Sequence, residues 1–431
     1  MVTRTLCSKL RPLPHVRSTT AFAMAVVAHP TRVLICDPES ITFSQDEPTY
    51  SDPETENAIK AAVQHLIERH VVAFPTETVY GLGALALDAS AATKIFSTKG
   101  RPSDNPLIVH ISSHAMLTSL LPPSYVPSPA YKTLMRTFWP GPLTLLFPAD
   151  PSIVPPIITA GHPTVAVRMP AHPVARALIA ATGAPLAAPS ANASGKPSPT
   201  RAAHVLRDLG STGRLPLLLD GGACAVGLES TVVDGLGADG TLRVLRPGGA
   251  TVEALIEALC GAGAGGGGAR PRVLVHERDF VLGRDEEDAP TTPGMKYRHY
   301  APGVPVTLLY TTTTPPDDGG AGAARHVGLE AFFREAAGEG GASGRLGLMA
   351  QDDSPLLARA RLEGTRWFTF SLGESAEPAR AAQRLFEGLL SLEEQGVERI
   401  FVQEVAEERE GLAFMNRIKK AAGTTLRIVD I

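Results

Sequence analysis

The amino-acid sequence predicts an α/β protein with two domains. Its length of 431 residues exceeds what one hydrophobic core usually carries. Short apolar runs alternate with helical patterns along most of the chain, and this alternation is typical of α/β sheet domains. A stretch of almost pure glycine and alanine at residues 261–268 cannot form a packed element, so it predicts the boundary between the domains.

The first domain is expected to open with an amphipathic helix over residues 53–69. Apolar residues recur there at helical spacing, Asp52 is suited to the N-cap, and Pro53 occupies the first helical position. A helix over residues 252–260 is expected to close the domain. Between the two helices, apolar runs predict strands at residues 71–74, 107–111, 164–167, 217–219, 231–233 and 242–245.

The second domain resumes the alternation after the glycine-rich stretch. This order of elements predicts a small Rossmann-like α/β domain. The domain has no G-x-G-x-x-G motif, so a dinucleotide-binding role is unsupported. Strands are expected at residues 304–310, 346–349, 367–372 and 399–405, and helices at residues 378–394 and 412–422.

Charge and composition limit the class of protein. The formal net charge is -4, so no overall basic field would attract nucleic acid or an anionic membrane. No run of 18 or more apolar residues occurs, and we expect no membrane span. The 4 cysteines are widely scattered and form no C-x-x-C pair, so we interpret them as reduced thiols of an intracellular, cytoplasmic protein.

Residues 1–50 are predicted to be an N-terminal extension. The first 36 residues contain no Asp or Glu, and their basic residues lie among Ser and Thr, as in an organellar transit peptide. A disordered tail would have a similar composition. Met24 could also serve as a second start that omits much of this segment. One gene would then supply a cytoplasmic form and, through the extension, a mitochondrial form.

Polar and cationic residues gather at the ends of the predicted strands of the first domain. Hydroxyls and glycines follow the strand that ends at Phe74, and residues 189–195 form a small polar turn. Arg168 and Arg246 end two further strands, and Ser230 precedes another. Ligands commonly bind at the carboxyl ends of strands in open α/β sheets. We therefore expect these segments to line one anion-binding cleft.

Lys99 and Arg101 lie in a segment that two prolines hold extended. A rigid basic loop suits a polyphosphate, whereas an isolated K-x-R is more often a solvated surface pair. Arg168 suits a bidentate grip on a substrate carboxylate, and a salt bridge at the edge of the core is the alternative. Ser190 and Asn192 could contact a ligand or merely build a turn.

Several familiar catalytic designs are absent from the sequence. It contains no G-x-x-x-x-G-K-[ST], no G-x-S-x-G and no H-E-x-x-H, which argues against a P-loop, a hydrolase nucleophile elbow and a zincin site. The 12 histidines form no cluster of metal ligands. We expect no metal site built from protein side chains.

In their order along the chain, these segments resemble the YrdC-like threonylcarbamoyl-AMP synthases, in the long form with a C-terminal extension domain. The resemblance implies a YrdC-like twisted open-sheet domain at residues 51–262, a glycine-rich stretch and linker at 263–303, and a Rossmann-like domain at 304–431. It covers nearly everything from residue 53 to the last residue. Its most specific segments are residues 75–83, 99–110, 189–200, 229–234, 293–302 and 411–417.

The resemblance also implies roles for individual residues. Lys99 and Arg101 would be catalytic, and Tyr297 would contact the nucleotide from a linker that closes over the pocket as a lid. The residues around L-threonine would be Thr78, His110, Arg168, Ser190 and Ser230. Those around ATP would be Lys99, Arg101, Asn105, Thr164, Asn192, Thr200, Arg246 and Tyr297.

The reaction implied by the resemblance joins L-threonine, bicarbonate and ATP, with Mg²⁺ on the triphosphate, into threonylcarbamoyl-AMP and pyrophosphate. The product would pass to a tRNA threonylcarbamoyl transferase complex that makes N6-threonylcarbamoyladenosine, and weak binding of tRNA is a further expectation. Catalysis would consist mainly of positioning and charge neutralisation, without a covalent enzyme intermediate.

Two other functions remain open at this point. The first is an RNA-binding module of the same fold without catalysis, for example one that binds double-stranded RNA, although the acidic net charge weakens it. The second is a carbamoyl-adenylating domain of the hydrogenase-maturation type. That system couples the domain to C-x-x-C zinc fingers, which this sequence lacks.

Overall fold

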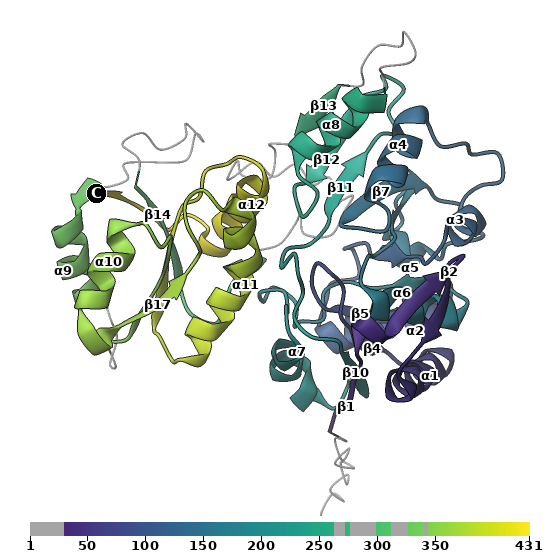
Figure 1. Ribbon diagram of the computed structural model, residues 1–431, viewed down its shortest axis with the longest axis horizontal. Coiled ribbons are helices and arrows are strands. Elements are labelled where there is room, and N and C mark those ends of the chain that lie inside the picture. The colour runs from purple at the N-terminus through teal and green to yellow at the C-terminus, as the bar shows by residue number, and fades with distance from the viewer. Residues whose placement is uncertain (1–29, 263–271, 276–298, 312–325, 340–343) are drawn as a thin grey trace, which may run out of the picture.

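The computed structural model describes residues 30–262, 272–275, 299–311, 326–339 and 344–431. These residues fold into two α/β domains, which Figure 1 shows side by side. The predicted fold class is confirmed. Residues 1–29, for which a transit peptide and a disordered tail were the two predictions, lie outside the described residues. So do most of the glycine-rich stretch and Tyr297 with most of its linker.

Within the described ranges, an 11-stranded mixed sheet forms the centre of the first domain. The strand order is β1-β10-β4-β5-β9-β6-β8-β7-β11-β12-β13, and parallel and antiparallel neighbours are mixed along it. The strands are β1 (Arg32–Ile35), β4 (Val72–Phe74), β5 (Gly81–Leu85), β6 (Ile108–His110), β7 (Leu143–Pro148), β8 (Thr164–Arg168), β9 (Leu186–Ala187), β10 (Leu217–Asp220), β11 (Thr231–Asp234), β12 (Leu242–Arg246) and β13 (Val273–Val275).

Helices cover both faces of this sheet. Successive residues of a strand point to opposite faces. In β4, Ala73 therefore packs in one apolar cluster with residues of α2, α4, α7 and α8, while Val72 and Phe74 pack in another with α1 and α6. The helical elements are α1 (Pro53–Ile67), α2 (Ala89–Lys99), α3 (His114–Leu120), α4 (Pro129–Phe138), α5 (Pro156–Thr159), α6 (Pro173–Thr182), α7 (Ala202–Leu209), α8 (Val252–Ala262), and the 3₁₀ turns η1 (Pro38–Ser40) and η2 (Gly210–Thr212).

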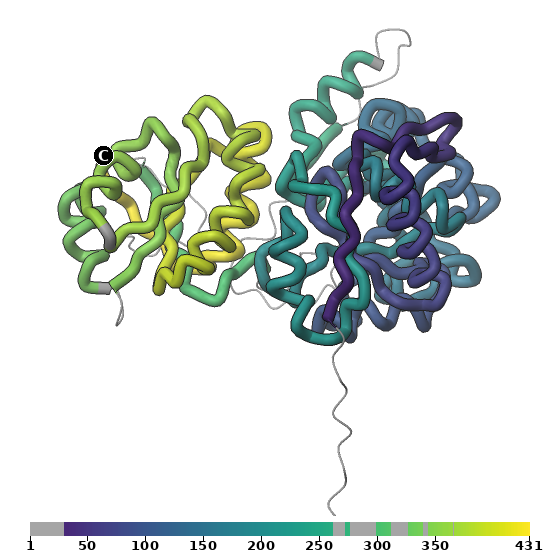
Figure 2. Tube along the Cα trace, turned by 60° about the horizontal axis from the view of Figure 1, so that its bottom comes forward, coloured from purple at the N-terminus to yellow at the C-terminus, as the bar shows by residue number. Residues whose placement is uncertain are grey.

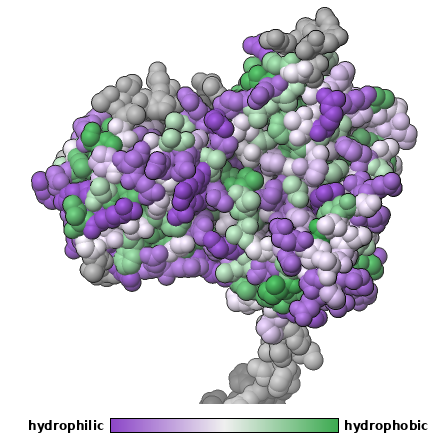
Figure 3. Space-filling model, in the orientation of Figure 1, coloured by the Kyte–Doolittle hydropathy of each residue, from purple (hydrophilic) through white to green (hydrophobic). Residues whose placement is uncertain are grey.

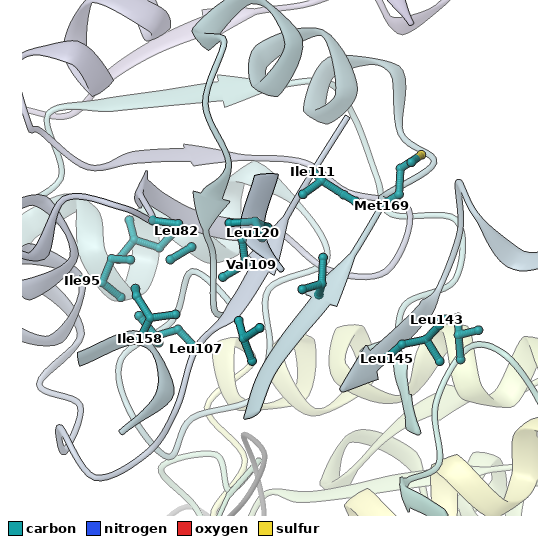
Figure 4. Close-up of a cluster of buried hydrophobic side chains, with 14 of the residues drawn as sticks. Leu82, Ile95, Leu107, Val109, Ile111, Leu120, Leu143, Leu145, Ile158 and Met169 are labelled. Atoms are coloured by element: carbon teal, nitrogen blue, oxygen red, sulfur yellow. The ribbon is translucent and has the colours of Figure 1, made fainter. Parts of the chain in front are cut away.

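The larger apolar cluster anchors the strands whose ends form the candidate site. In Figure 4, Leu82 of β5 and Val109 of β6 lie close together, and Ile95 of α2 lies near Ile158 of α5. All four side chains are fully buried. Because a packed core resists displacement, it fixes the positions at which these strands end.

Residues 32–50, which the sequence analysis placed in the N-terminal extension, are folded as part of the first domain. Strand β1 pairs in parallel with β10. The hairpin of β2 (Ile41–Ser44) and β3 (Glu47–Tyr50) packs on α6, where the guanidinium of Arg176 lies 4.0 Å from the centre of the Phe43 ring. The start of this segment is the dark purple tube that runs across the first domain in Figure 2.

The second domain is built on a regular 6-stranded parallel sheet, counted over the described residues. Helices α9 and α10 pack on one face of the sheet, and α11 and α12 pack on the other. The strand order is β15-β19-β14-β18-β16-β17. The elements are β14 (Val306–Tyr310), β15 (His326–Gly328), α9 (Leu329–Glu339), β16 (Leu346–Ala350), α10 (Pro355–Leu362), η5 (Gly364–Arg366), β17 (Trp367–Ser371), α11 (Pro378–Glu394), β18 (Arg399–Gln403), α12 (Glu410–Ala422) and β19 (Leu426–Asp430).

The face of the second domain that carries α11 and α12 is turned toward the first domain (Figure 1). Val79 and Leu228 of the first domain are buried in the same apolar cluster as residues of these two helices. At Gly227, an added Cβ would lie 2.3 Å from the backbone oxygen of Gln383 in α11, so the close approach of the two backbones requires glycine. The two domains therefore share part of their cores.

None of the helices within the described ranges is both long and apolar enough to cross a membrane. On the face drawn in Figure 3, hydrophilic residues cover most of the area and the apolar patches are small and scattered.

Candidate active site

A concave hollow in the first domain brings charged and polar side chains together, as small-molecule sites do. Strand ends and the turns that follow them form its wall. The residues that line it are Thr78, Val79, Lys99, Arg101, Ile108, His110, Arg168, Ala188, Pro189, Ser190, Asn192, Ser194, Gly195, Lys196, Ser198, Glu229, Ser230, Arg246, His299 and Tyr300.

Lys99 enters the pocket from the last residue of α2. The helix stops there because Gly100 adopts the left-handed conformation that favours glycine, with φ 62°. The Lys99 ammonium donates to the backbone oxygen of Ser190 and, at 2.6 Å, to that of Asn192. Burial lowers the pKa of Lys99 well below its usual value, and the nearby Arg101 lowers it further. A negatively charged ligand in the pocket would offset this cost.

Arg101 and Arg246 complete a cluster of three cations with Lys99, in which Lys99 and Arg246 are buried and Arg101 is half-buried. The Arg101 guanidinium donates to the backbone oxygen of Pro106 at 3.0 Å, and burial lowers its pKa to about 10. Arg246 ends β12, is 5% exposed, and donates to the backbone oxygen of Ser230 at 2.9 Å. Burial lowers the pKa of Arg246 as well. Such a concentration of positive charge suits a polyphosphate.

Arg168 ends β8 and lines a different part of the pocket. Its guanidinium forms an ion pair with Glu77, with 2.5 Å between Nη2 and Oε1, and donates to the Thr78 hydroxyl at 2.9 Å. Both side chains are almost completely buried, with Arg168 4% and Glu77 11% exposed. The salt bridge that the sequence analysis offered as an alternative is thus present. Arg168 nevertheless remains part of the pocket wall.

His110 and Ser230 flank this second part of the pocket. His110 ends β6, directly beside Arg168 in the parallel pairing of β6 and β8. Burial and the Arg168 charge lower the pKa of His110 to about 3, so its imidazole is neutral at physiological pH. The Ser230 hydroxyl lies 2.8 Å from the Thr144 hydroxyl, which fixes its orientation. This part of the pocket offers hydroxyls and a neutral imidazole around one guanidinium.

The structure brings most of the predicted site residues together. All the residues predicted to surround threonine line the pocket, and so do Lys99, Arg101, Asn192 and Arg246 from the predicted ATP set. Three others of that set do not line it. Asn105 is buried, with 1% of its surface exposed. Thr164 begins β8, at the end of the strand opposite Arg168. The Thr200 hydroxyl lies 3.4 Å from Nδ1 of His204. Tyr297 lies outside the described residues.

Sequence reasoning missed several residues of the wall. Glu229 lines the pocket, and Glu77 pairs with Arg168 without lining it. Both lie in segments that the sequence marks as unusual, but an isolated Glu gives no signal that a buried cation pairs with it. His299 and Tyr300 close the pocket from the described end of the predicted linker, where the backbone nitrogen of Ala301 donates to the Gly195 oxygen at 3.0 Å. Part of the linker thus does reach the pocket.

The acidic side chains at the pocket do not form a metal cage. Among the residues that the structure describes, there is no group of three or more His, Cys, Asp or Glu that could hold a metal ion. Glu77 pairs with Arg168, and Glu229 pairs with Arg417 of the second domain.

Comparisons with known proteins agree with this arrangement of domains. A family model described as telomere recombination matches residues 64–248, and one described as the C-terminal domain of threonylcarbamoyl-AMP synthase matches residues 251–423. The chain is 42% identical over 378 residues to the threonylcarbamoyl-AMP synthase of Bacillus subtilis, an overlap that covers 88% of this chain and 95% of the relative. The Schizosaccharomyces pombe threonylcarbamoyl-AMP synthase is also 42% identical, over 86% of this chain and 89% of the relative.

A solved structure resembles both domains together. The crystal structure of P. abyssi Sua5 complexed with L-threonine has a TM-score of 0.71 and 35% sequence identity, and the match covers 93% of this chain and 100% of that chain. The similarity thus includes the second domain and its placement as well as the pocket. From its sequence and its two-domain structure, the chain belongs to the threonylcarbamoyl-AMP synthase family.

Proposed function

We propose that this chain is an L-threonylcarbamoyladenylate synthase, a nucleotidyltransferase that makes threonylcarbamoyl-AMP and pyrophosphate from L-threonine, bicarbonate and ATP. One observation carries the proposal. A single pocket joins a cluster of three cations, Lys99, Arg101 and Arg246, which suits a triphosphate, to a small polar part around Arg168 that suits an amino acid. The family comparisons favour this function over an RNA-binding module or a carbamoyl-adenylating domain.

The proposed reaction needs two steps in the same pocket. The threonine amine first attacks the carbon of bicarbonate, which loses water and leaves an N-carboxylate. An oxygen of that carboxylate then attacks the α-phosphorus of ATP, the bond from this phosphorus to the oxygen that bridges to the β-phosphate breaks, and pyrophosphate leaves with the electron pair. Negative charge grows on the transferring phosphoryl and leaving groups, where Lys99, Arg101 and Arg246 would stabilise it.

The second part of the pocket would hold threonine. Thr78, His110, Ser190 and Ser230 would surround the amino acid, and Arg168 would meet its carboxylate from a position that Glu77 fixes. The neutral His110 can accept or donate one hydrogen bond without adding charge. Because P. abyssi Sua5, a structural relative of this chain, was crystallised with L-threonine, threonine is the amino acid we expect here.

Magnesium would enter as part of the substrate, bound to the ATP triphosphate. The described residues offer no group of acidic ligands for a resident ion, and Mg²⁺ commonly reaches such sites on substrate phosphates. The roles of Asn105, Thr164, Thr200 and Tyr297 toward ATP stay predictions. So do weak tRNA binding, delivery of the product to a tRNA threonylcarbamoyl transferase complex, and a mitochondrial form beside the cytoplasmic one. N-terminal sequencing of the protein from each compartment would test the last of these.

The proposed function is tested by following pyrophosphate release and the transfer of labelled bicarbonate into an acyl-adenylate. We expect release to require L-threonine and bicarbonate, and to be much slower with serine or alanine. Arg101→Ala should lower the rate by about 10² to 10³-fold, which is the usual cost of removing one such contact. A matched control is Lys94→Ala, on the same helix but outside the pocket wall. Release that ignores threonine would reject the proposal.

A further inference from the structure

Glu229 is a buried carboxylate in a pocket that is otherwise rich in cations. It is 8% exposed and directly precedes Ser230 in the pocket wall. Its Oε1 accepts a hydrogen bond from the Ser198 hydroxyl at 2.6 Å, and its Oε2 accepts one from Nε of Arg417 at 3.1 Å. A buried carboxylate so close to a phosphate-binding cluster would repel the nucleotide unless another charge balanced it.

The balancing charge comes from the second domain. Arg417 lies on α12, is 0% exposed, and reaches 188 residues back along the sequence to Glu229. Its Nη1 also donates to the backbone oxygen of Pro247, the residue after Arg246. Its guanidinium carbon lies 5.7 Å from the centre of the Tyr300 ring, which closes the pocket from the linker side. Arg417 thus joins three segments of the pocket wall.

Arg246 is the second cation near Glu229. Burial alone would raise the pKa of Glu229, but the charges of Arg417 and Arg246 outweigh burial and lower it. The carboxylate is therefore ionised, and two guanidinium groups lie within its influence. Of these two, Arg246 lines the pocket, whereas Arg417 is not among the lining residues.

We propose that Arg417 is a positioning residue for the reaction: by pairing with Glu229 it keeps Arg246 directed at the nucleotide instead of at that carboxylate. This inference rests on the proposed function, because it assigns Arg246 to ATP. Without Arg417, Glu229 would be a buried charge with Arg246 as its nearest cation, and pairing of those two would withdraw positive charge from the triphosphate. The second domain would in this way complete the nucleotide part of the pocket without touching the substrate.

The first test is the kinetics of Arg417→Ala in the full chain. We expect KM for ATP to rise at least about tenfold, the equivalent of one charged hydrogen bond, while KM for threonine changes less than about threefold. Adding Glu229→Gln to Arg417→Ala should recover most of the loss, because it removes the unpaired charge. Arg417→Lys, which keeps the charge but cannot make both hydrogen bonds of the guanidinium, should raise KM for ATP less than Arg417→Ala does. A residue that only held the domains together would show no rescue by Glu229→Gln.

Three further measurements make the outcome decisive. If Arg417→Ala does not fold, Arg417→Gln, which keeps hydrogen-bonding groups but no charge, replaces it in the same series. Glu387→Gln is the matched control, since it breaks an exposed ion pair with Arg201 across the same domain boundary and should leave both KM values unchanged. The affinity for ATP alone, measured by calorimetry, repeats the comparison without turnover.

The possible results separate the two proposals. If the wild type binds ATP but releases no threonine-dependent pyrophosphate, the proposed function fails, while weaker ATP binding by Arg417→Ala and its rescue by Glu229→Gln would still support the positioning role. Unchanged ATP affinity in a folded Arg417→Ala variant would overturn that role. A loss that Glu229→Gln does not reverse would also overturn it.

Discussion

The two domains differ in where they bury charge. In the first domain, Lys99, Arg168, Glu229 and Arg246 are all buried, and all of them line one pocket at strand ends. In the second domain, the buried residues of the sheet are almost all apolar, with an aromatic group of Phe332, Phe333, Trp367 and Phe401 on one face. The buried Arg417 of the second domain points to the first and pairs with Glu229.

Because of this difference, the free-energy cost of burying charged side chains falls mainly on the first domain. Burying a charge is costly unless a partner or a ligand compensates for it, so buried charges mark the place where a ligand is expected. The regular parallel sheet of the second domain has few such costs and can serve as a rigid support for α11 and α12. The chain has 2 tryptophans, Trp139 in the first domain and Trp367 in the second, so each domain has its own fluorescent reporter.

The largest expected effect comes from breaking the buried ion pair of the first domain. Arg168→Ala leaves the Glu77 carboxylate buried without its cation, which should cost about 3 to 5 kcal/mol of the free energy of unfolding. It should also lower kcat/KM for threonine by about 100-fold or more. Urea unfolding of variants that carry Trp367→Phe would follow the first domain alone, through Trp139.

A double variant separates stability from activity at this pair. Glu77→Gln with Arg168→Met removes both charges, so most of the lost stability should return while the activity stays low. A loss below about 1 kcal/mol for Arg168→Ala alone would mean that the pair contributes little to the domain, and that burial of charge does not distinguish the two domains energetically.

Much of the fold could be predicted from local patterns. Helix α1 and strands such as β8 and β12 were predicted to within two residues of their observed ends, because their apolar spacing and N-cap residues are unambiguous. Strand β5 was missed because it is rich in glycine. At Gly83, an added Cβ would lie 2.5 Å from the ring of Phe74 on the neighbouring strand, so close packing selects a residue with low strand propensity.

The candidate site could be predicted only in part, for a related reason. Cations at strand ends give a visible signal in the sequence, and most of them do line the pocket. Their partners give none, because pairing depends on contacts between distant segments. Arg168 and Glu77 are 91 residues apart, and Arg417 and Glu229 are 188 apart. The order of the strands in the sheet cannot be predicted from local patterns for the same reason, since β1 pairs with β10, which follows much later in the chain of the same domain.

Lowering the pH is expected to have an intermediate effect, a loss of stability mainly in the first domain. Burial lowers the pKa of His110 to about 3 and that of His204 to about 4, with Arg168 and Arg207 respectively adding to the shift. In the unfolded chain each imidazole would take up a proton near pH 6.5. Between that pH and the lower pKa of the folded state, the unfolded state therefore binds more protons than the folded state does. The contribution of these histidines to the free energy of unfolding is therefore fully present above pH 6.5 and is lost as the pH falls, by up to about 2 kcal/mol for each histidine at pH 5.

The second domain should not share this loss. There, burial raises the pKa of Glu404, so its contribution to stability is present at low pH and declines as the pH rises. Urea unfolding at pH 7 and pH 5, followed through each tryptophan, should show a shift for Trp139 and little for Trp367. Burial also lowers the pKa values of His172 and His299, so His204→Gln should remove only its own part of the shift, up to about 2 kcal/mol at pH 5. Equal losses in both domains would contradict the assignment to buried histidines.

The smallest expected effects come from two matched helix caps. The Ser128 hydroxyl accepts a hydrogen bond from the backbone nitrogen of Tyr131 at the start of α4, and the Ser354 hydroxyl accepts one from Leu356 at the start of α10. Replacing either serine by alanine should cost about 1 kcal/mol. We expect Ser128→Ala to shift only the unfolding seen by Trp139, and Ser354→Ala only that seen by Trp367. If either change moved both transitions equally, the two domains would unfold as one cooperative unit, because their shared core around Val79 and Leu228 would then outweigh their separate ones.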